Sequence, residues 1–147
     1  MKIRRVEPRD EQEWLRMRLA LWPHDTAERH LVDMAEYDQP DIKMATFVAE
    51  RPAGGLGGFL EASLRPYANG CDTKPVGYIE GWYVDEDLRR QGVGGELVQA
   101  AEAWAMAQGC TEMGSDCLID NEVSAHAHQA LGYQEAERVI CFSKKLR

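Results

Sequence analysis

The sequence lacks several features that define large classes of protein. It has no uninterrupted run of about 18 apolar residues, so we expect no membrane-spanning helix. Its first residues, MKIRRVEPRDEQEW, contain no apolar stretch after their charges, so we expect no signal peptide there. The four cysteines form no C-x-x-C pair, so neither a metal site nor a disulfide framework is expected. We therefore expect a cytoplasmic protein with no membrane partner.

Positive charge is also in short supply. Lys and Arg number 17 against 25 Asp and Glu, which gives a formal net charge of −8. Nucleic acid is then a poor candidate partner, because its phosphates attract basic surfaces. An acidic cleft would attract a cationic small molecule, although acidity also serves solubility alone. The 147 residues suit a single domain spanning 1–147, with no repeat or linker to divide it.

Hydrophobic periodicity and turn residues predict a mixed α/β (α+β) protein, with helices on both faces of one sheet. Pro8 and Pro23 bracket the first helix, and Asp25 or Thr26 is a candidate cap for the second. The predicted strands are 2–6, 43–51, 59–65, 76–84, 110–117 and one or two within 133–146; the predicted helices are 11–21, 26–37, 93–108 and 120–132.

A Gly-rich turn, RRQGVGG, follows the predicted strand 76–84 and opens a helix. The first backbone N–H groups of a helix have no partner within it and favour an anion there. Glycines allow close backbone approach, and the arginines add charge-assisted hydrogen bonds. The patterns G-x-x-x-x-G-K-[ST] and G-x-G-x-x-G are both absent, which argues against an NTP-binding loop and a dinucleotide fold. The turn alone predicts an anion site, or simply a link between strand and helix.

The spacing Arg89-x-x-Gly92-x-Gly94 resembles the R/Q-x-x-G-x-G/A signature of the GCN5-related N-acetyltransferase (GNAT) family. The segment HQALGY at 128–133 is similar to the second signature of that family, and the order of elements fits along nearly the whole chain. The resemblance implies a mostly antiparallel sheet that splays where acetyl-CoA, the co-substrate, binds. It also implies a bulge in strand 76–84, where Gly81 is the residue most able to accept one.

The resemblance assigns residues to acetyl-CoA and to direct acetyl transfer. Glu80 would be the general base for the incoming amine, and the Val84 N–H would stabilise the oxyanion. His128 stands where many members have a tyrosine that protonates the leaving thiolate, so His128 is our candidate acid; the other reading is an ordinary helix residue. The residues implied to hold the cofactor are Trp82, Tyr83, Val84, Arg90, Gln91, Gly92, Val93, Gly94, Gly95 and Asn121.

Other segments resemble aminoglycoside 6'-N-acetyltransferases, the members of this family that confer antibiotic resistance. They are LALWP, YANGCD, YIEGWYV, GSD and HQALGYQEAERVI. A polycationic sugar needs carboxylates for its ammonium groups and aromatic faces for its rings. By position, the implied substrate-binding residues are Trp22, Tyr67, Glu80, Asp116 and Glu137.

Plainer interpretations stay open for these residues. Trp22 ends an amphipathic helix, where core packing is the commoner role, and each carboxylate can be a solvated surface group. The resemblance also fits an acetyltransferase of polyamines or protein N-termini, and a non-catalytic acyl-CoA-binding module. Dimers are common in the group, so a homodimer is expected, with no metal.

Overall fold

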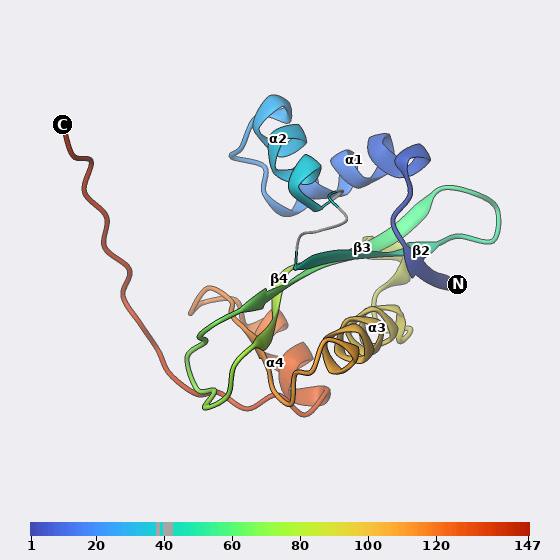
Figure 1. Ribbon diagram of the computed structural model, residues 1–147. Coiled ribbons are helices and arrows are strands. Elements are labelled where there is room, and N and C mark those ends of the chain that lie inside the picture. The colour runs from blue at the N-terminus through green and yellow to red at the C-terminus, as the bar shows by residue number, and fades with distance from the viewer. Residues whose placement is uncertain (38, 40–42) are drawn as a thin grey trace. The chain divides into compact units, whose positions relative to one another are not determined.

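The computed structural model describes residues 1–37, 39 and 43–147. These residues form two compact units, 1–115 and 116–147, each of which is described by itself. The first unit is a sheet with helices on both faces (Figure 1). Its strands are β1 (Lys2–Arg5), β2 (Met44–Glu50), β3 (Leu56–Arg65), β4 (Val76–Val84) and β5 (Met113–Ser115); its helices are α1 (Glu11–Leu21), α2 (Ala27–Tyr37) and α3 (Val93–Ala107), with 3-10 turns η1 (Pro8–Asp10) and η2 (Glu86–Leu88).

The five strands lie in the order β1-β2-β3-β4-β5. Neighbours are antiparallel except β4 and β5, which are parallel, so the predicted mixed, mostly antiparallel sheet is confirmed. The last β4–β5 pair is Ile79 with Ser115, whereas β4 itself runs on to Val84. The second half of β4 thus extends beyond this pairing, as a sheet that splays at this point requires.

The predicted bulge is present in β4. On β3, Glu61 pairs with Gly81 and Ala62 pairs with Ile79, so Glu80 is the extra residue. A bulge bends its strand and redirects the side chain that it carries. The residue presented by the bulge is therefore the predicted base, Glu80, and not the neighbouring glycine.

The two faces of the sheet are covered by different helices. Helices α1 and α2 lie on one face and α3 on the other (Figure 1). Alternation along β3 sends Phe59 and Glu61 toward α1, while Gly58 on the same strand approaches Leu97 of α3. The core beneath α1 and α2 is built from Trp14, Met17, Met34, Val48, Leu56 and Phe59.

The helix ends follow the expected capping chemistry. Helix α1 has the predicted bounds, and α2 begins one residue late because the Thr26 hydroxyl accepts a hydrogen bond from the Arg29 N–H. Helix α3 begins after Gly92, which adopts a left-handed φ of 85°. None of the helices among the described residues has both the length and the apolar content needed to cross a bilayer.

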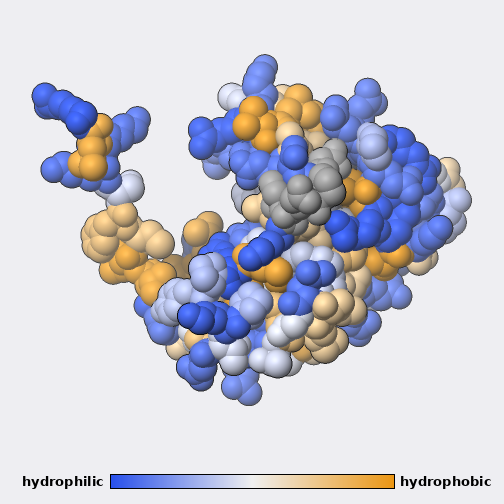
Figure 2. Space-filling model, viewed as in Figure 1, coloured by the Kyte–Doolittle hydropathy of each residue, from blue (hydrophilic) through white to orange (hydrophobic). Residues whose placement is uncertain are grey.

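The second unit contains α4 (Glu122–Ala130), which Asn121 caps by accepting a hydrogen bond from the Ser124 N–H. Gly132, at a φ of 93°, ends it as predicted. The strands predicted within 133–146 are wrong: these residues form no helix or strand. Strand propensity takes effect only where a neighbouring edge supplies ladder partners, and none pairs with this segment among the described residues. Several apolar side chains stay exposed here: Val139, Ile140, Phe142 and Leu146 (Figure 2).

Candidate active site

The Gly-rich turn leads from the end of β4 into α3. Arg90 has a φ of 63° and Gly92 one of 85°, so two left-handed residues flank Gln91. Alternating backbone conformations of this kind turn successive N–H groups into one concave surface, a common anion cradle. The helix that follows presents the N–H groups of Val93, Gly94 and Gly95 in its first turn. The predicted phosphate-binding residues are thus contiguous at one helix start.

Two side chains of the turn bond back to it. Arg89 donates from Nε to the Val84 carbonyl at 2.9 Å, with its guanidinium 5.8 Å from the centre of the Tyr83 ring. Gln91 donates to the Asp87 carbonyl at 2.9 Å. Arg90 is exposed. Arg89 is exposed as well, but its hydrogen bond to the Val84 carbonyl ties it to the turn.

A cluster of ion pairs fixes the start of this turn to the rest of the first unit. Asp85 accepts hydrogen bonds at 3.0 Å from Arg16 of α1 and from Arg51, which follows β2. Arg51 also binds Asp87 at 2.8 and 2.9 Å. Burial opposes ionisation of Asp85, but the hydrogen bonds from Arg16 and Arg51 outweigh it and lower the pKa of this carboxyl. The start of the turn is therefore fixed both to α1, through Arg16, and to the end of β2, through Arg51.

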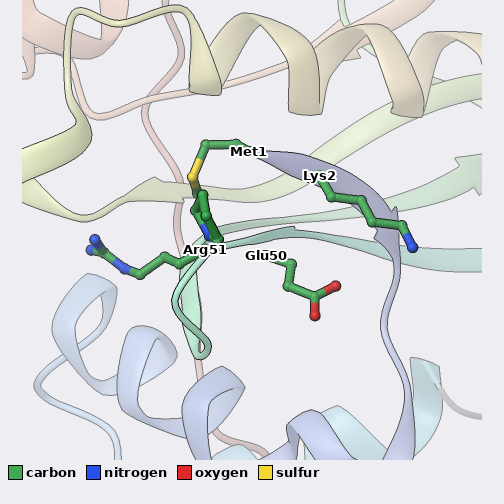
Figure 3. A pocket seen from close by; sticks show the side chains of 5 residues that line it. Met1, Lys2, Glu50 and Arg51 are labelled. Atoms are coloured by element: carbon green, nitrogen blue, oxygen red, sulfur yellow. The ribbon is translucent and has the colours of Figure 1, made fainter.

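Beside Arg51, a shallow pocket opens at the outer ends of β1 and β2. Met1, Lys2, Glu50, Arg51 and Pro52 line it (Figure 3). Its carboxylate is already engaged, because Glu50 accepts a hydrogen bond from Arg4 at 2.8 Å. Arg51 is likewise paired with Asp85 and Asp87. The pocket contains none of the predicted site residues.

Glu80 lies in a network of its own on the face covered by α1 and α2. Arg65 binds it with two hydrogen bonds, Nε to Oε2 at 2.9 Å and Nη2 to Oε1 at 2.6 Å. The Ser63 hydroxyl donates to Oε2 at 2.5 Å. The Arg65 guanidinium in turn stacks 3.6 Å from the centre of the Tyr78 ring. These contacts fix the carboxylate, and Oε1 accepts one of these bonds and keeps a second lone pair.

Trp22 follows α1 and packs on β4 next to Glu80. An added Cβ on Gly81 would lie 2.9 Å from Cζ2 of the indole and closer still to Cη2. The φ of Gly81 lies outside the left-handed region, so the glycine supplies space here and not an unusual backbone conformation. The structure thus brings two of the five predicted substrate-binding residues, Trp22 and Glu80, to adjacent positions.

A buried charged cluster lies beneath Trp22. The carboxylate of Glu61, 1% exposed, accepts hydrogen bonds from Trp14 Nε1 at 2.8 Å and Arg18 Nη1 at 2.9 Å. Burial raises the pKa of Glu61 to about 7, against the lowering effects of the Arg18 charge and the Trp14 hydrogen bond. Burial likewise raises the pKa of Tyr37, with the charges of Glu61 and Glu80 adding to it. Several acidic groups therefore share this region.

Sequence reasoning missed Arg18, His30, Glu61, Ser63 and Arg65. Glu61 carried a usable signal, since a lone carboxylate in the apolar run GGFLEASL is buried if the run is a strand. The others could not be found, because only the register of β3 with β4 and the packing of α1 and α2 bring them to Glu61 and Glu80.

The remaining predicted residues are placed separately. Tyr67 is exposed in the loop after β3. Asp116, Asn121, His128 and Glu137 belong to the second unit. There, His128 Nδ1 lies 2.7 Å from the Ser124 carbonyl oxygen, which can only accept, so Nδ1 carries a proton. The His128 ring meets Tyr133 edge to face at 5.8 Å. No group of three His, Cys, Asp or Glu side chains in the described part of the chain could hold a metal ion.

The chain is similar to a known protein family, to curated relatives and to solved structures. The model of the acetyltransferase (GNAT) family matches residues 5–133. A relative from Klebsiella aerogenes, aminoglycoside N(6')-acetyltransferase type 1, is 44% identical over 146 residues, covering 98% of this chain and 96% of the relative.

Two solved structures are also similar along their full length. The structure of AAC(6')-Iy in complex with the bisubstrate analogue CoA-S-monomethyl-acetylneamine has a TM-score of 0.92 and 39% identity, covering 99% of this chain and 98% of that one. The ligand-free AAC(6')-IG of Acinetobacter haemolyticus has a TM-score of 0.92 and 38% identity, covering all of both chains. With the R-x-x-G-x-G turn, the bulged β4 and the family match over most of its length, the chain belongs to the acetyltransferase (GNAT) family.

Proposed function

We propose that this protein is an aminoglycoside 6'-N-acetyltransferase, which transfers an acetyl group from acetyl-CoA to the 6'-amine of these antibiotics and so confers resistance. The observation that carries the proposal is the full-length similarity to enzymes of that name, at 44% identity with the Klebsiella aerogenes relative. The arrangement of an indole beside a carboxylate at Trp22 and Glu80 supports it, because cationic sugars bind through such pairs.

The donor would bind along the end of β4 and the turn into α3. Trp82, Tyr83 and Val84 would offer backbone groups to the pantetheine arm, where β4 extends past its last pair with β5. The backbone from Arg90 to Gly95 would hold the pyrophosphate at the start of α3. Asn121 would contact the pantetheine region, with its side-chain oxygen already capping α4.

Transfer would be direct. The amine nitrogen attacks the thioester carbonyl carbon, the carbon–sulfur bond breaks, and the leaving thiolate takes a proton. Glu80 would accept the proton of the ammonium through the free lone pair of Oε1 or through a water molecule. The Val84 N–H would stabilise the oxyanion, and His128, as an imidazolium with a proton on each ring nitrogen, would protonate the thiolate from Nε2.

Tyr67, Asp116 and Glu137 complete the proposed set of substrate-binding residues. Tyr67 lies in the exposed loop after β3, and loops commonly carry binding groups. Asp116 and Glu137 are two of the acidic residues that give the chain its net charge of −8. A polycationic acceptor is favoured by both features.

Release of free thiol with matched acceptors tests the proposal. Neomycin and paromomycin differ in carrying an amine or a hydroxyl at position 6', so thiol release with neomycin and none with paromomycin is expected. Equal release with both would place acetylation at another amine. Faster release with spermidine or with peptide N-termini would favour the rival acetyltransferases. Binding of acetyl-CoA without thiol release for any amine would favour a non-catalytic module.

We also propose that the protein acts in the cytoplasm as a homodimer. The four cysteines are all free thiols, as is usual in a reducing compartment. The exposed apolar side chains between Val139 and Leu146 favour a partner, because such surfaces commonly mark interfaces. Analytical ultracentrifugation of the full chain measures the oligomeric state, and a monomer at micromolar concentration would contradict the dimer.

A further inference from the structure

A chain of contacts connects the buried cluster beneath Trp22 to the indole itself. Arg18 donates from Nε to His30 Nδ1 at 3.2 Å and from Nη1 to Glu61 at 2.9 Å. Its guanidinium lies 4.8 Å from the centre of the Trp22 ring. His30 Nε2 lies 3.1 Å from the Trp22 carbonyl, and its ring stacks with the indole at 6.2 Å.

These contacts fix the state of His30. Because Nδ1 accepts from the Arg18 guanidinium, it carries no proton, and Nε2–H is the donor to the Trp22 carbonyl. His30 is fully buried and Arg18 is 5% exposed. The backbone and the ring of Trp22 are therefore both held from below by side chains that solvent does not reach.

The opposite contact of the indole is with β4. Its edge lies over Gly81, where a Cβ would force it to move. Gly81 pairs with Glu61 across the sheet and follows Glu80 directly. Glu61, which anchors Arg18, is thus the cross-strand neighbour of Gly81, which lies beneath the indole. The proposed base, Glu80, is the bulge residue next to Gly81.

We propose that Arg18, His30 and Gly81 are positioning residues of the acceptor site, which fix the Trp22 indole beside Glu80 and thereby set the affinity for the aminoglycoside. This inference rests on the proposed function for its substrate. None of the three contacts the substrate itself; each acts through Trp22. The position of the indole matters, since a misplacement of about 1 Å in an active site can cost about 100-fold in rate.

Two matched alanine substitutions on β4 test the inference. Gly81→Ala pushes on the indole, whereas Gly77→Ala places a Cβ 2.7 Å from Ala105 Cβ and 2.5 Å from Met113 Sδ, on the α3 face. Both destabilise the fold. Gly81→Ala is expected to raise the KM for neomycin at least about tenfold with the KM for acetyl-CoA unchanged. Gly77→Ala is expected to change neither KM, and an equal rise in both variants would overturn the proposal.

A double-mutant cycle with Trp22→Ala makes the test specific. Once the indole is gone, Gly81→Ala has nothing to displace, so its effect on the neomycin KM is expected to vanish in the Trp22→Ala background. The same factor in both backgrounds would show that Gly81 acts without Trp22 and would sink the proposal.

Two substitutions of His30, one disruptive and one conservative, test its role. His30→Leu removes both the acceptor and the donor and is expected to raise the neomycin KM alone, while His30→Gln keeps one of each and restores part of the affinity. Equal loss in both variants would refute the positioning role of His30.

The cycle also separates this inference from the proposed function. If the wild type acetylates no aminoglycoside, the proposed function fails, and the coupling between Gly81→Ala and Trp22→Ala still shows in the free energy of unfolding by urea. If the wild type acetylates neomycin and the two substitutions are additive in both measurements, the positioning inference alone fails.

Discussion

The raised pKa of the buried Glu61 carboxyl makes the free energy of unfolding depend on pH. Burial raises its pKa from the ordinary 4.5 to about 7, with the charges of Asp33 and Glu80 adding to the rise. Arg18 and the Trp14 N–H oppose it but do not cancel it. In the unfolded chain this carboxyl is solvated and loses its proton near pH 4.5.

The sign of the effect follows from the protons bound. Between pH 4.5 and about 7, the folded state holds a proton on Glu61 that the unfolded state has lost, so the free energy of unfolding falls as pH rises. At about 1.4 kcal/mol per pH unit, the loss over this window amounts to about 3 kcal/mol. The contribution is fully present below pH 4.5 and absent above the folded pKa.

Glu61→Gln isolates this contribution, because the amide oxygen still accepts from Arg18 and Trp14 but does not titrate. Urea unfolding at half-unit steps from pH 4 to 8, followed by circular dichroism, gives the free energy of unfolding of both proteins. Groups that titrate alike in the wild type and in Glu61→Gln cancel in the difference between their free energies of unfolding. The wild type is expected to lose about 3 kcal/mol relative to Glu61→Gln as pH rises through the window.

Two results would refute the reasoning. A difference that stays constant with pH would mean that Glu61 titrates alike in the folded and unfolded states. A wild type that gains stability relative to Glu61→Gln as pH rises would mean that the Arg18 ion pair outweighs burial and lowers the pKa. Glu50→Gln is a matched control, since Glu50 pairs with Arg4 at 2.8 Å at the sheet edge and Arg4 lowers its pKa, so its curve should slope the opposite way at acid pH.

Three further substitutions probe the proposed chemistry. Gly92→Val disfavours the φ of 85° by roughly 1–2 kcal/mol, so the turn is expected to leave the conformation that would hold the pyrophosphate and the KM for acetyl-CoA to rise about tenfold in steady-state assays; an unaltered KM would count against the phosphate cradle. Glu80→Gln should lower kcat by about 100-fold with little change in that KM, and an unchanged kcat–pH profile would remove the base role. His128→Phe keeps the edge-to-face packing on Tyr133 but carries no proton, so kcat should fall where the wild type is active, and an unchanged kcat–pH profile would remove the acid role.

Much of the fold could be predicted because local signals and tertiary structure agree. Helix α1 and strand β4 have the predicted bounds, since proline, capping residues and β-branched runs mark their ends. The Gly-rich turn after β4 could be predicted because the need for Gly92 at positive φ is local. The segment 133–146 could not, because apolar β-branched residues indicate a strand only when a partner edge is available.

The acceptor region was only half predictable for a related reason. Trp22 and Glu80 could be assigned through resemblance, but nothing in the sequence pairs Glu80 with Arg65 and Ser63. That arrangement arises because the bulge shifts the register between Glu61 and Ala62 and turns Glu80 toward β3. The register of β3 with β4 thus lets Ser63 and Arg65, which lie 17 and 15 positions from Glu80 in the sequence, donate hydrogen bonds to its carboxylate.

Gly81 shows how a correct expectation can have the wrong cause. A glycine beside a bulge is usually explained by backbone freedom, yet the extra residue here is Glu80, and Gly81 lies outside the left-handed region. What the position requires is the absence of a side chain, because the indole of Trp22 occupies that space. Gly92 is the opposite case, since nothing lies within 4 Å of an added Cβ and its φ of 85° alone demands glycine. The two glycines look alike in sequence, but alanine should strain the backbone at Gly92 and displace a binding residue at Gly81.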